Sequence, residues 1–306
     1  MLSIEKITEI FCHLDDFSQK FMIWFKKRLS ENENVDNFSW ESCSLCMSEV
    51  MCILILFHLS SYRNLKAFYT EYVCVHLSKE FPSLPSYNRF VELEKEVLLP
   101  LFGFLTLHGR GKCSGISFVD STSLKVCHNK RIPAHKVFDG IAKRGKNSMG
   151  WFFGFKLHLL INEKGEIISL ALTQANVDDR NDKVMDHLMK GVFGKVFGDK
   201  GYIKKELFER LWKKGIQLIT RLKKNMKNHL IPLMDKILLR KRAIIETVND
   251  LLKNVCQIEH SRHRSPVNFL VNLIAALIGY NFLPKKPSLR WNKKEKKILD
   301  SLMLTM

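Results

Sequence analysis

The chain has 306 residues, of which 46% are hydrophobic, and this is enough apolar material for a real core and argues against a disordered chain. Its net charge of +18 is unevenly spread: residues 1–100 carry 10 Lys and Arg against 14 Asp and Glu, and residues 101–306 carry 39 against 17. This excess of positive charge indicates a polyanionic partner such as nucleic acid, and is less well explained as the surface of a soluble protein that is merely basic.

Three features predict the compartment. The eight cysteines are scattered, mostly in apolar helical context, and this suggests reduced, buried thiols. Charged residues interrupt the start of the chain, so we expect no secretory signal. The longest apolar stretch, 267–282, contains three asparagines and is short for a membrane span, so it predicts a buried helix. We therefore expect a cytoplasmic protein with no membrane partner.

The first third has a helical pattern. Apolar residues recur every three or four positions over three segments, 3–29, 43–60 and 63–78. A fourth helix is predicted to begin near Ser86, which can cap it. This helix and the one before it could form a helix-turn-helix that brings Arg89 to DNA, but a plain helical bundle is an equal alternative because this part is slightly acidic. Residues 1–108 are predicted to form this all-α N-terminal DNA-binding domain.

After a glycine-rich linker at 109–115 the pattern changes to strands alternating with helices. Strands are predicted at 116–121, 151–162, 167–174, 195–199 and 216–221. Helices are predicted at about 180–191, 203–214 and 241–255. Three meandering strands followed by alternating helices and strands indicate an α/β, ribonuclease-H-like domain with a mixed five-stranded sheet. We assign residues 109–284 to this catalytic domain and 285–306 to a basic C-terminal tail.

Two of these strands end in an aspartate. Asp120 follows Ile116 and Phe118 on one face of its strand, and Asp199 follows Val196 and Phe197. If the strands are neighbours, both carboxylates meet at the carboxyl end of the sheet. They would repel each other unless cations lay between them. Mg²⁺ accepts carboxylate, water and substrate oxygens, and two ions about 3.5–4 Å apart can hold the attacking and leaving oxygens of a phosphodiester.

A third carboxylate comes from a helix. At about 100° per residue, Arg242, Glu246 and Lys253 share one helical face, so Glu246 could bind metal while the two cations hold phosphates. The alternative is an ordinary amphipathic helix with a solvated charged face. Asp250 lies on the same side and competes for the role of third ligand.

Other basic residues could contact DNA. Lys156 and His158 alternate with apolar residues on the predicted strand 151–162, so they share a face that either contacts phosphate or is exposed. Lys130 and Arg131 belong to a basic loop after the first strand and suit backbone contact.

Two further groups have ordinary structural interpretations. Trp151, like the two phenylalanines that follow it, is more typical of a core than of a base-stacking surface. Asp178 and Asp179 could be a second acidic pair, but they precede a predicted helix and are better explained as its cap.

The motifs around the three acids resemble those of DDE-type bacterial insertion-sequence transposases. The matching segments are Phe118-Val-Asp120-Ser-Thr, Thr173-Gln-Ala-Asn-Val-Asp-Asp179 and Phe197-Gly-Asp199-Lys-Gly-Tyr202. Arg242, Glu246 and Lys253 match the third block of that superfamily, although Leu239 stands where a tyrosine is usual. The segments Cys127-His-Asn-Lys-Arg131 and Gly150-Trp-Phe-Phe-Gly-Phe-Lys-Leu-His158 resemble the insertion-sequence-982 family.

The resemblance spans about residues 3–284 and implies a function. Asp120, Asp199 and Glu246 would be the catalytic metal ligands, holding two Mg²⁺ ions with Mn²⁺ as an alternative. The protein would cleave the terminal inverted repeats of its element in double-stranded DNA and join the 3′-hydroxyl ends to target DNA, acting as a homodimer or larger assembly in the bacterial cytoplasm on the nucleoid. Two alternatives stay open: a catalytically silent DNA-binding protein, and a ribonuclease-H-like nuclease that does not join.

Overall fold

The computed structural model describes residues 2–30, 40–147, 149–222, 226, 230–259 and 263–295. The chain divides into two compact units. Unit 1 comprises Met1–Gly109, Lys136–Phe138 and Leu251–Pro284, and unit 2 comprises Arg110–His135, Asp139–Asp250 and Lys285–Met306. None of the described helices is long and apolar enough to cross a membrane.

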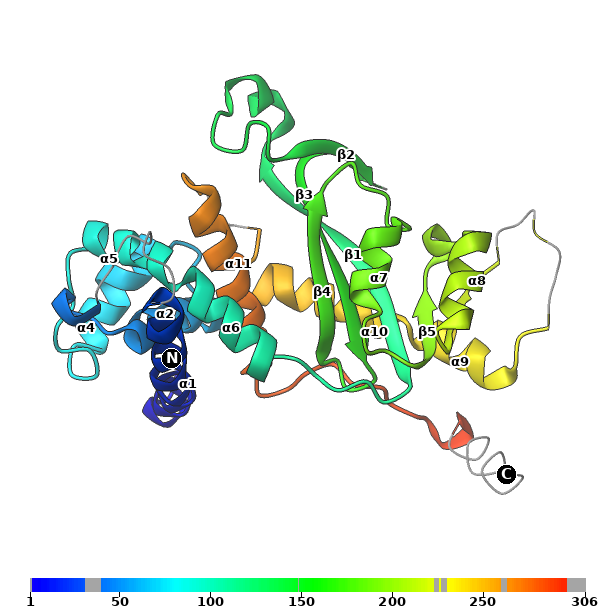
Figure 1. Ribbon diagram of the computed structural model, residues 1–306, viewed down its shortest axis with the longest axis horizontal. Coiled ribbons are helices and arrows are strands. Elements are labelled where there is room, and N and C mark those ends of the chain that lie inside the picture. The colour runs from blue at the N-terminus through cyan, green and yellow to red at the C-terminus, as the bar shows by residue number, and fades with distance from the viewer. Residues whose placement is uncertain are drawn as a thin grey trace. The chain divides into compact units, whose positions relative to one another are not determined.

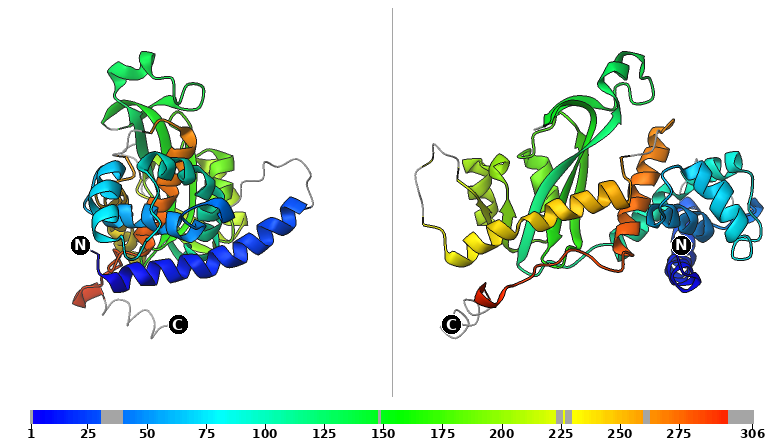
Figure 2. Two further views of the ribbon diagram at one scale, coloured as in Figure 1. Left: turned by 90° about the vertical axis from the view of Figure 1, so that its left-hand side faces the viewer. Right: turned by 180° about the vertical axis from the view of Figure 1, so that it is seen from behind.

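Unit 1 is helical (Figure 1). Its α-helices are α1 (Ile4–Ser30), α2 (Met47–Leu59), α3 (Leu65–Ala67), α4 (Cys74–His76), α5 (Tyr87–Glu94), α6 (Leu98–His108) and α11 (Pro266–Asn281). Figure 2 shows α1 as one long, uninterrupted helix. Helices α2 and α11 are apolar on nearly every side and are buried along most of their length, as expected of helices at the centre of a bundle.

The two central helices of unit 1 pack closely on each other. Gly279 of α11 faces His58 of α2, and a Cβ built at Gly279 would lie 3.3 Å from the His58 Cβ. The buried helix predicted at 267–282 is confirmed as α11. Because α11 packs on α2 and α6, residues 251–284 group with the helical unit, whereas the sequence placed them in the catalytic domain.

The segment before α5 differs from a helix-turn-helix. A π-helical segment, Phe68–Val73, joins α3 to α4, and residues 77–86 then separate α4 from α5. This connection is longer than the turn of about three or four residues in that motif, so it favours the plain bundle. Ser86 caps α5 as predicted, because its Oγ accepts a hydrogen bond from the Arg89 N–H at 3.4 Å.

Unit 2 is built on a mixed sheet, which confirms the α/β class and the ribonuclease-H-like order of elements. Its strands are β1 (Ile116–Cys127), β2 (Lys143–Asn147), β3 (Gly150–Asn162), β4 (Ile167–Gln174), β5 (Gly194–Gly198) and β6 (Ile216–Thr220). Its α-helices are α7 (Asp182–Leu188), α8 (Lys205–Lys213), α9 (Leu233–Lys241) and α10 (Ala243–Asp250). The strand order is β2-β3-β1-β5-β6, and β4 pairs with β3.

The sheet has two differently covered faces. Val119 of β1, Val196 of β5 and Leu218 of β6 join one core cluster with residues of α7 and α8. Side chains alternate along a strand, so Phe118 and Phe197 point to the opposite face, where their rings pack 5.7 Å apart. Figure 1 shows α7 and α8 on the near side of the sheet. The right-hand view of Figure 2, seen from behind, shows α9 and α10 in front of the opposite face.

The sheet is larger than the five strands predicted. Strand β1 continues to Cys127 because it pairs with β3 along its whole length. Strand β2 was not predicted, since its sequence KRGKN has no alternation of apolar residues, and only its pairing with the start of β3 defines it.

Two smaller expectations are corrected. Only two of the eight cysteines, Cys52 and Cys256, are buried; three are partly buried and three are exposed. The described part of the predicted tail is not separate from unit 2: the Leu289 N–H donates to the Glu163 carbonyl at 2.8 Å, and Lys241 forms an ion pair with Glu295 at 2.9 Å. Residues 296–306 of the predicted tail lie outside the described residues.

Candidate active site

Asp120 and Asp199 lie in matching positions on neighbouring strands. Strands β1 and β5 are parallel, and Phe118 pairs with Phe197 in their register. Each aspartate comes two residues after its phenylalanine, so both continue the same face just beyond the paired segment of β1 and β5, with Asp120 inside β1 and Asp199 after the end of β5. The condition that the sequence prediction set, that these two strands are neighbours, is thereby confirmed.

Three more polar side chains lie near Asp120: Asn249 and Glu246 of α10, and Arg242 just before this helix. Asn249 Nδ2 donates to Asp120 Oδ2 at 3.1 Å. The guanidinium of Arg242, at the junction of α9 and α10, lies 3.9 Å from Asp120 Oδ1 and also binds the carboxylate of Glu246. Arg242 therefore bridges the strand acid and the helix acid.

The electrostatics of the cluster centre on Asp120. Burial is the main cause that raises the pKa of this carboxyl to about 7; Arg242 and the Ser121 N–H lower the pKa, and the carboxylates of Asp199 and Glu246 add smaller increases. Both other acids of the predicted triad thus act on Asp120. Asp250, the competing third acid, is not among the main causes of this shift.

Several buried polar atoms beside Asp120 have no hydrogen-bond partner within the described residues. They are Tyr202 Oη, Arg242 Nη1 and Asn249 Oδ1. Burial, and then the charges of Asp120, Asp179 and Asp199, raise the pKa of Tyr202 well above its ordinary value, so its hydroxyl stays a donor. Unsatisfied buried polar groups are costly, and a cluster of them indicates a place for a polar or charged occupant.

The donor set fits a hard divalent cation. Three carboxylates and an amide oxygen are oxygen ligands of the kind that Mg²⁺ accepts. In the described part of the chain, however, no three Asp, Glu, His or Cys side chains lie close enough together to hold one ion. Glu246, whose side chain is 57% exposed, pairs with Arg242, and Asp199 Oδ1 accepts from the Gly201 N–H.

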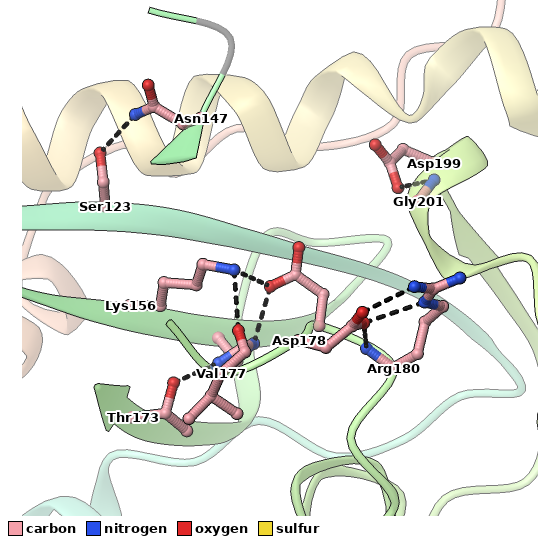
Figure 3. Close-up of polar contacts among 11 residues, drawn as sticks. Ser123, Asn147, Lys156, Thr173, Val177, Asp178, Arg180, Asp199 and Gly201 are labelled. Atoms are coloured by element: carbon pink, nitrogen blue, oxygen red, sulfur yellow. Dashed lines mark hydrogen bonds and ion pairs between the residues drawn. The ribbon is translucent and has the colours of Figure 1, made fainter. Parts of the chain in front are cut away.

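Lys156 and His158 lie on the other face of the sheet from Asp120. Antiparallel pairing sets Lys156 opposite Ser123 and His158 opposite Ser121, whereas Asp120 pairs with Leu159. Lys156 Nζ donates to the Val177 carbonyl at 2.9 Å and forms an ion pair with Asp179 at 3.1 Å (Figure 3).

His158 is not presented to DNA. Its side chain is fully buried, its Nε2 lies 2.9 Å from Thr173 Oγ1, and burial lowers its pKa to about 4. The expectation of a phosphate contact at His158 is therefore wrong, because its buried ring lies against Thr173 of β4 and Asp179.

The cap of α7 is also different from the prediction. Asn181, and neither Asp178 nor Asp179, caps this helix, accepting hydrogen bonds from the Lys183 and Val184 N–H groups. Asp178 instead accepts three hydrogen bonds from Arg180, which hold the pKa of its carboxyl well below the usual range. Figure 3 shows this pair beside the turn that contains Asp199 and Gly201.

The predicted position of Lys253 rested on a regular α-helix. The helix instead changes after Asp250 to a π-helical segment, Leu251–Val255, with the Cys256 N–H donating to the Leu251 carbonyl. The angle of about 100° per residue no longer applies there. Lys253 forms an ion pair with Glu259 at 3.1 Å.

The other predicted DNA contacts occupy exposed positions. Lys130 and Arg131 lie in a 3₁₀ turn, Asn129–Ala134, just after β1. Arg89 of α5 is exposed and pairs with Glu92 at 2.8 Å. DNA contact by these three residues stays a prediction.

Two residues of the site were missed by the sequence analysis. Asn249 follows Glu246 by three positions, so it shares the helical face that the acid uses, and this spacing could have revealed it. Tyr202 belongs to the matched segment around Asp199, but its burial beside three carboxylates depends on the fold.

The family comparison agrees with this geometry. A transposase DDE domain model matches residues 110–266, just over half of the chain, and includes all three acids. The chain belongs to the transposase DDE domain family. The DDE domain begins at the first residue of unit 2 and extends through α10 to the start of α11. A search of curated proteins finds no match to the chain.

Distant likenesses to solved structures accompany the family match. A piggyBac transposase synaptic complex with hairpin DNA shares 10% identity over 97% of this chain and 77% of that chain, with a TM-score of 0.49. A Mos1 transposase paired-end complex with left transposon end shares 12% identity over 65% of this chain and 66% of that chain, with a TM-score of 0.22. The fold assignment given above depends on the chain's own strand pairing.

Proposed function

We propose that this DDE protein cleaves the terminal inverted repeats of an insertion sequence and joins the freed 3′-hydroxyl ends to target DNA. The observation that carries the proposal is the matched register of Asp120 and Asp199, with Glu246 of α10 acting on the same carboxylate. The resemblance of its motifs to the insertion-sequence-982 family supports the proposal that the element belongs to that family.

The acids would hold two Mg²⁺ ions, or Mn²⁺ in their place, and the bound ions would supply positive charge to the attacking and leaving oxygens. Asn249 fixes the Asp120 carboxylate through its Nδ2. Arg242 supplies a fixed cation at the edge of the acid cluster, where it can also bind a phosphate oxygen. Tyr202 offers a buried hydroxyl that remains protonated.

The partner in this proposal is double-stranded DNA, bound in the bacterial cytoplasm. The excess of Lys and Arg over Asp and Glu in residues 101–306 favours a polyanion. Joining two ends of one element to a target requires at least two active sites, so we propose a homodimer or larger assembly.

Strand transfer tests this proposal. A labelled duplex carrying one end of the element with a free 3′-hydroxyl is incubated with supercoiled plasmid, Mg²⁺ and the full chain. We expect labelled plasmid with wild type and none with Glu246→Gln. Nicking without labelled plasmid would assign the protein to nucleases that do not join, and DNA binding without nicking would show a silent DNA-binding protein.

A further inference from the structure

A second polar site lies in unit 2 beside the turn of Asp199. It is a pocket of about 460 Å³, within the usual range for small-molecule sites. Its wall includes Arg144 and Lys146 of β2, Trp151 of β3, Lys156, Asp179 and Gly201.

The charges of this pocket leave two cations unpaired with acids. Asp178 is engaged by Arg180, and Asp179 by Lys156. Arg144 and Lys146 are exposed, and neither forms an ion pair with a carboxylate of the described chain. The two remaining cations make the pocket suited to an anion such as a phosphate group.

Trp151 gives the pocket an aromatic wall. Its side chain is 62% exposed, whereas the neighbouring Phe152 and Phe153 are buried, so the expectation that Trp151 is a core residue is wrong. Lys146 pairs with Trp151 across β2 and β3, and its Nζ lies 5.8 Å from the centre of the ring. Aromatic side chains next to cations are the usual platform for unpaired bases.

The hairpin that carries Trp151 is held close to β4. A Cβ built at Gly145 would lie 2.2 Å from the Ala175 carbonyl oxygen, so only glycine permits this approach of the two backbones. At the opposite wall, the Gly201 N–H donates to Asp199 Oδ1 at 2.7 Å. An occupant of the pocket would therefore lie directly beside an acid of the candidate active site.

We infer that this pocket binds one unpaired nucleotide of the DNA substrate, with its base stacked on Trp151 and its phosphate held by Arg144 and Lys146. The inference rests on the proposed function, because that function supplies DNA at Asp199. With such a pocket the protein would prefer DNA that is distorted or unpaired next to the cleavage point.

Binding to two duplexes tests the inference. One duplex is fully paired, the other has the same sequence with a single unpaired nucleotide, and both are titrated with the full chain in EDTA. Wild type should bind the second more tightly. Trp151→Ala should weaken that binding roughly 5- to 150-fold, the range of one lost base–aromatic stack, with little change for the paired duplex.

Matched variants control for general DNA contact and for folding. Trp212→Ala removes another tryptophan of unit 2, 67% exposed and outside this pocket, and should keep the preference for the unpaired nucleotide. Trp151→Phe, which retains an aromatic ring, should keep most of it. Lys146→Ala should weaken binding of the unpaired duplex more than Lys143→Ala, the same charge change on the same strand outside the pocket wall.

The outcomes separate the inference from the proposed function. Equal losses on both duplexes with Trp151→Ala, or no loss on either, would overturn the inference. A 2-aminopurine at the unpaired position gives a second measurement: wild type should quench its fluorescence on binding, and unchanged fluorescence would contradict stacking. Nicking by wild type in Mg²⁺ tests the proposed function by itself, because selective binding in EDTA requires no catalysis.

Discussion

The acid cluster on β1, β5 and α10 and the pocket beside it are neighbouring polar regions with opposite charge arrangements. In the pocket each carboxylate has its own cation, Arg180 for Asp178 and Lys156 for Asp179. In the acid cluster Arg242 is the one cation of the described residues that pairs with Asp120 and Glu246, and burial raises the pKa of Asp120 to about 7.

This difference indicates which kind of ligand each region binds. A cluster with more buried negative charge than its own cations neutralise is completed by an added cation. A pocket whose acids are already neutralised, and which retains two exposed cations, is completed by an anion. Metal and phosphate are the two components that phosphodiester chemistry needs at adjacent places.

The largest expected effect comes from removing an acid of the cluster. Asp199→Asn should lower the rate of Mg²⁺-dependent nicking at least about 10³-fold, because several kcal/mol of transition-state stabilisation depend on the bound cation. Asp186→Asn removes an acid of α7 that pairs with Lys214, and this variant should nick at nearly the wild-type rate. Similar rates for both variants would remove the distinction between the acid cluster and other carboxylates.

Asn249 should have the next largest effect. Asn249→Ala removes the donor to Asp120 Oδ2, and the Mg²⁺ concentration for half-maximal nicking should rise about 10- to 100-fold, as for other residues that orient metal ligands. Thr247→Ala, on the same helix but exposed, is the control. An unchanged Mg²⁺ requirement would show that Asp120 is held by other contacts.

Replacing Arg242 should change the stability of the protein in a way that depends on Mg²⁺. Arg242→Gln leaves Asp120 and Glu246 without their cation, so in EDTA at pH 8 the free energy of unfolding should fall by about 2 kcal/mol. Saturating Mg²⁺ should remove most of this deficit, since it replaces the missing charge. Thermal unfolding with and without Mg²⁺ measures both effects, and a deficit of the same size in Mg²⁺ would contradict the account.

The smallest effect is expected at Glu94 of unit 1, a buried carboxylate for which the described residues show a hydrogen bond but no ion pair. Burial raises its pKa to about 7, and Asn268 Nδ2 donates to it at 2.9 Å. The folded-state pKa of Glu94 lies above its ordinary value of 4.5, so this side chain stabilises the fold in its protonated form. That contribution is complete below about pH 4.5 and is lost as the pH rises through about 7.

Glu94→Gln, which stays neutral, should therefore gain about 1 kcal/mol of stability over wild type between pH 5 and pH 8. Denaturant unfolding at the two pH values measures this gain, and Mg²⁺ should not alter it. The exposed Glu92→Gln is the control. A gain of the same size in Glu92→Gln would show that the effect is one of net charge.

The core of the candidate site could be predicted from sequence because it depends on short-range rules. Asp120 and Asp199 each follow a short apolar run, and alternation fixes which face they share once the strands are neighbours. Glu246 lies one helical turn from Arg242, and their contact follows from that spacing.

The rest depends on structure that no local pattern encodes. The π-helical segment after Asp250 invalidates the helical angle used for Lys253. Strand β2 has no apolar period, so neither its pairing with β3 nor the exposed position of Trp151 opposite Lys146 could be foreseen. The burial of His158 requires β4 and Asp179 to cover β3.

Binding of Mn²⁺ to the full chain, counted by electron paramagnetic resonance of the free ion, tests the central claim most directly. The account predicts binding to wild type that weakens at least about tenfold in Asp120→Asn, Asp199→Asn and Glu246→Gln alike, and that is unchanged in Asp186→Asn. Binding of equal strength in all five proteins would contradict the assignment of these acids as the metal site.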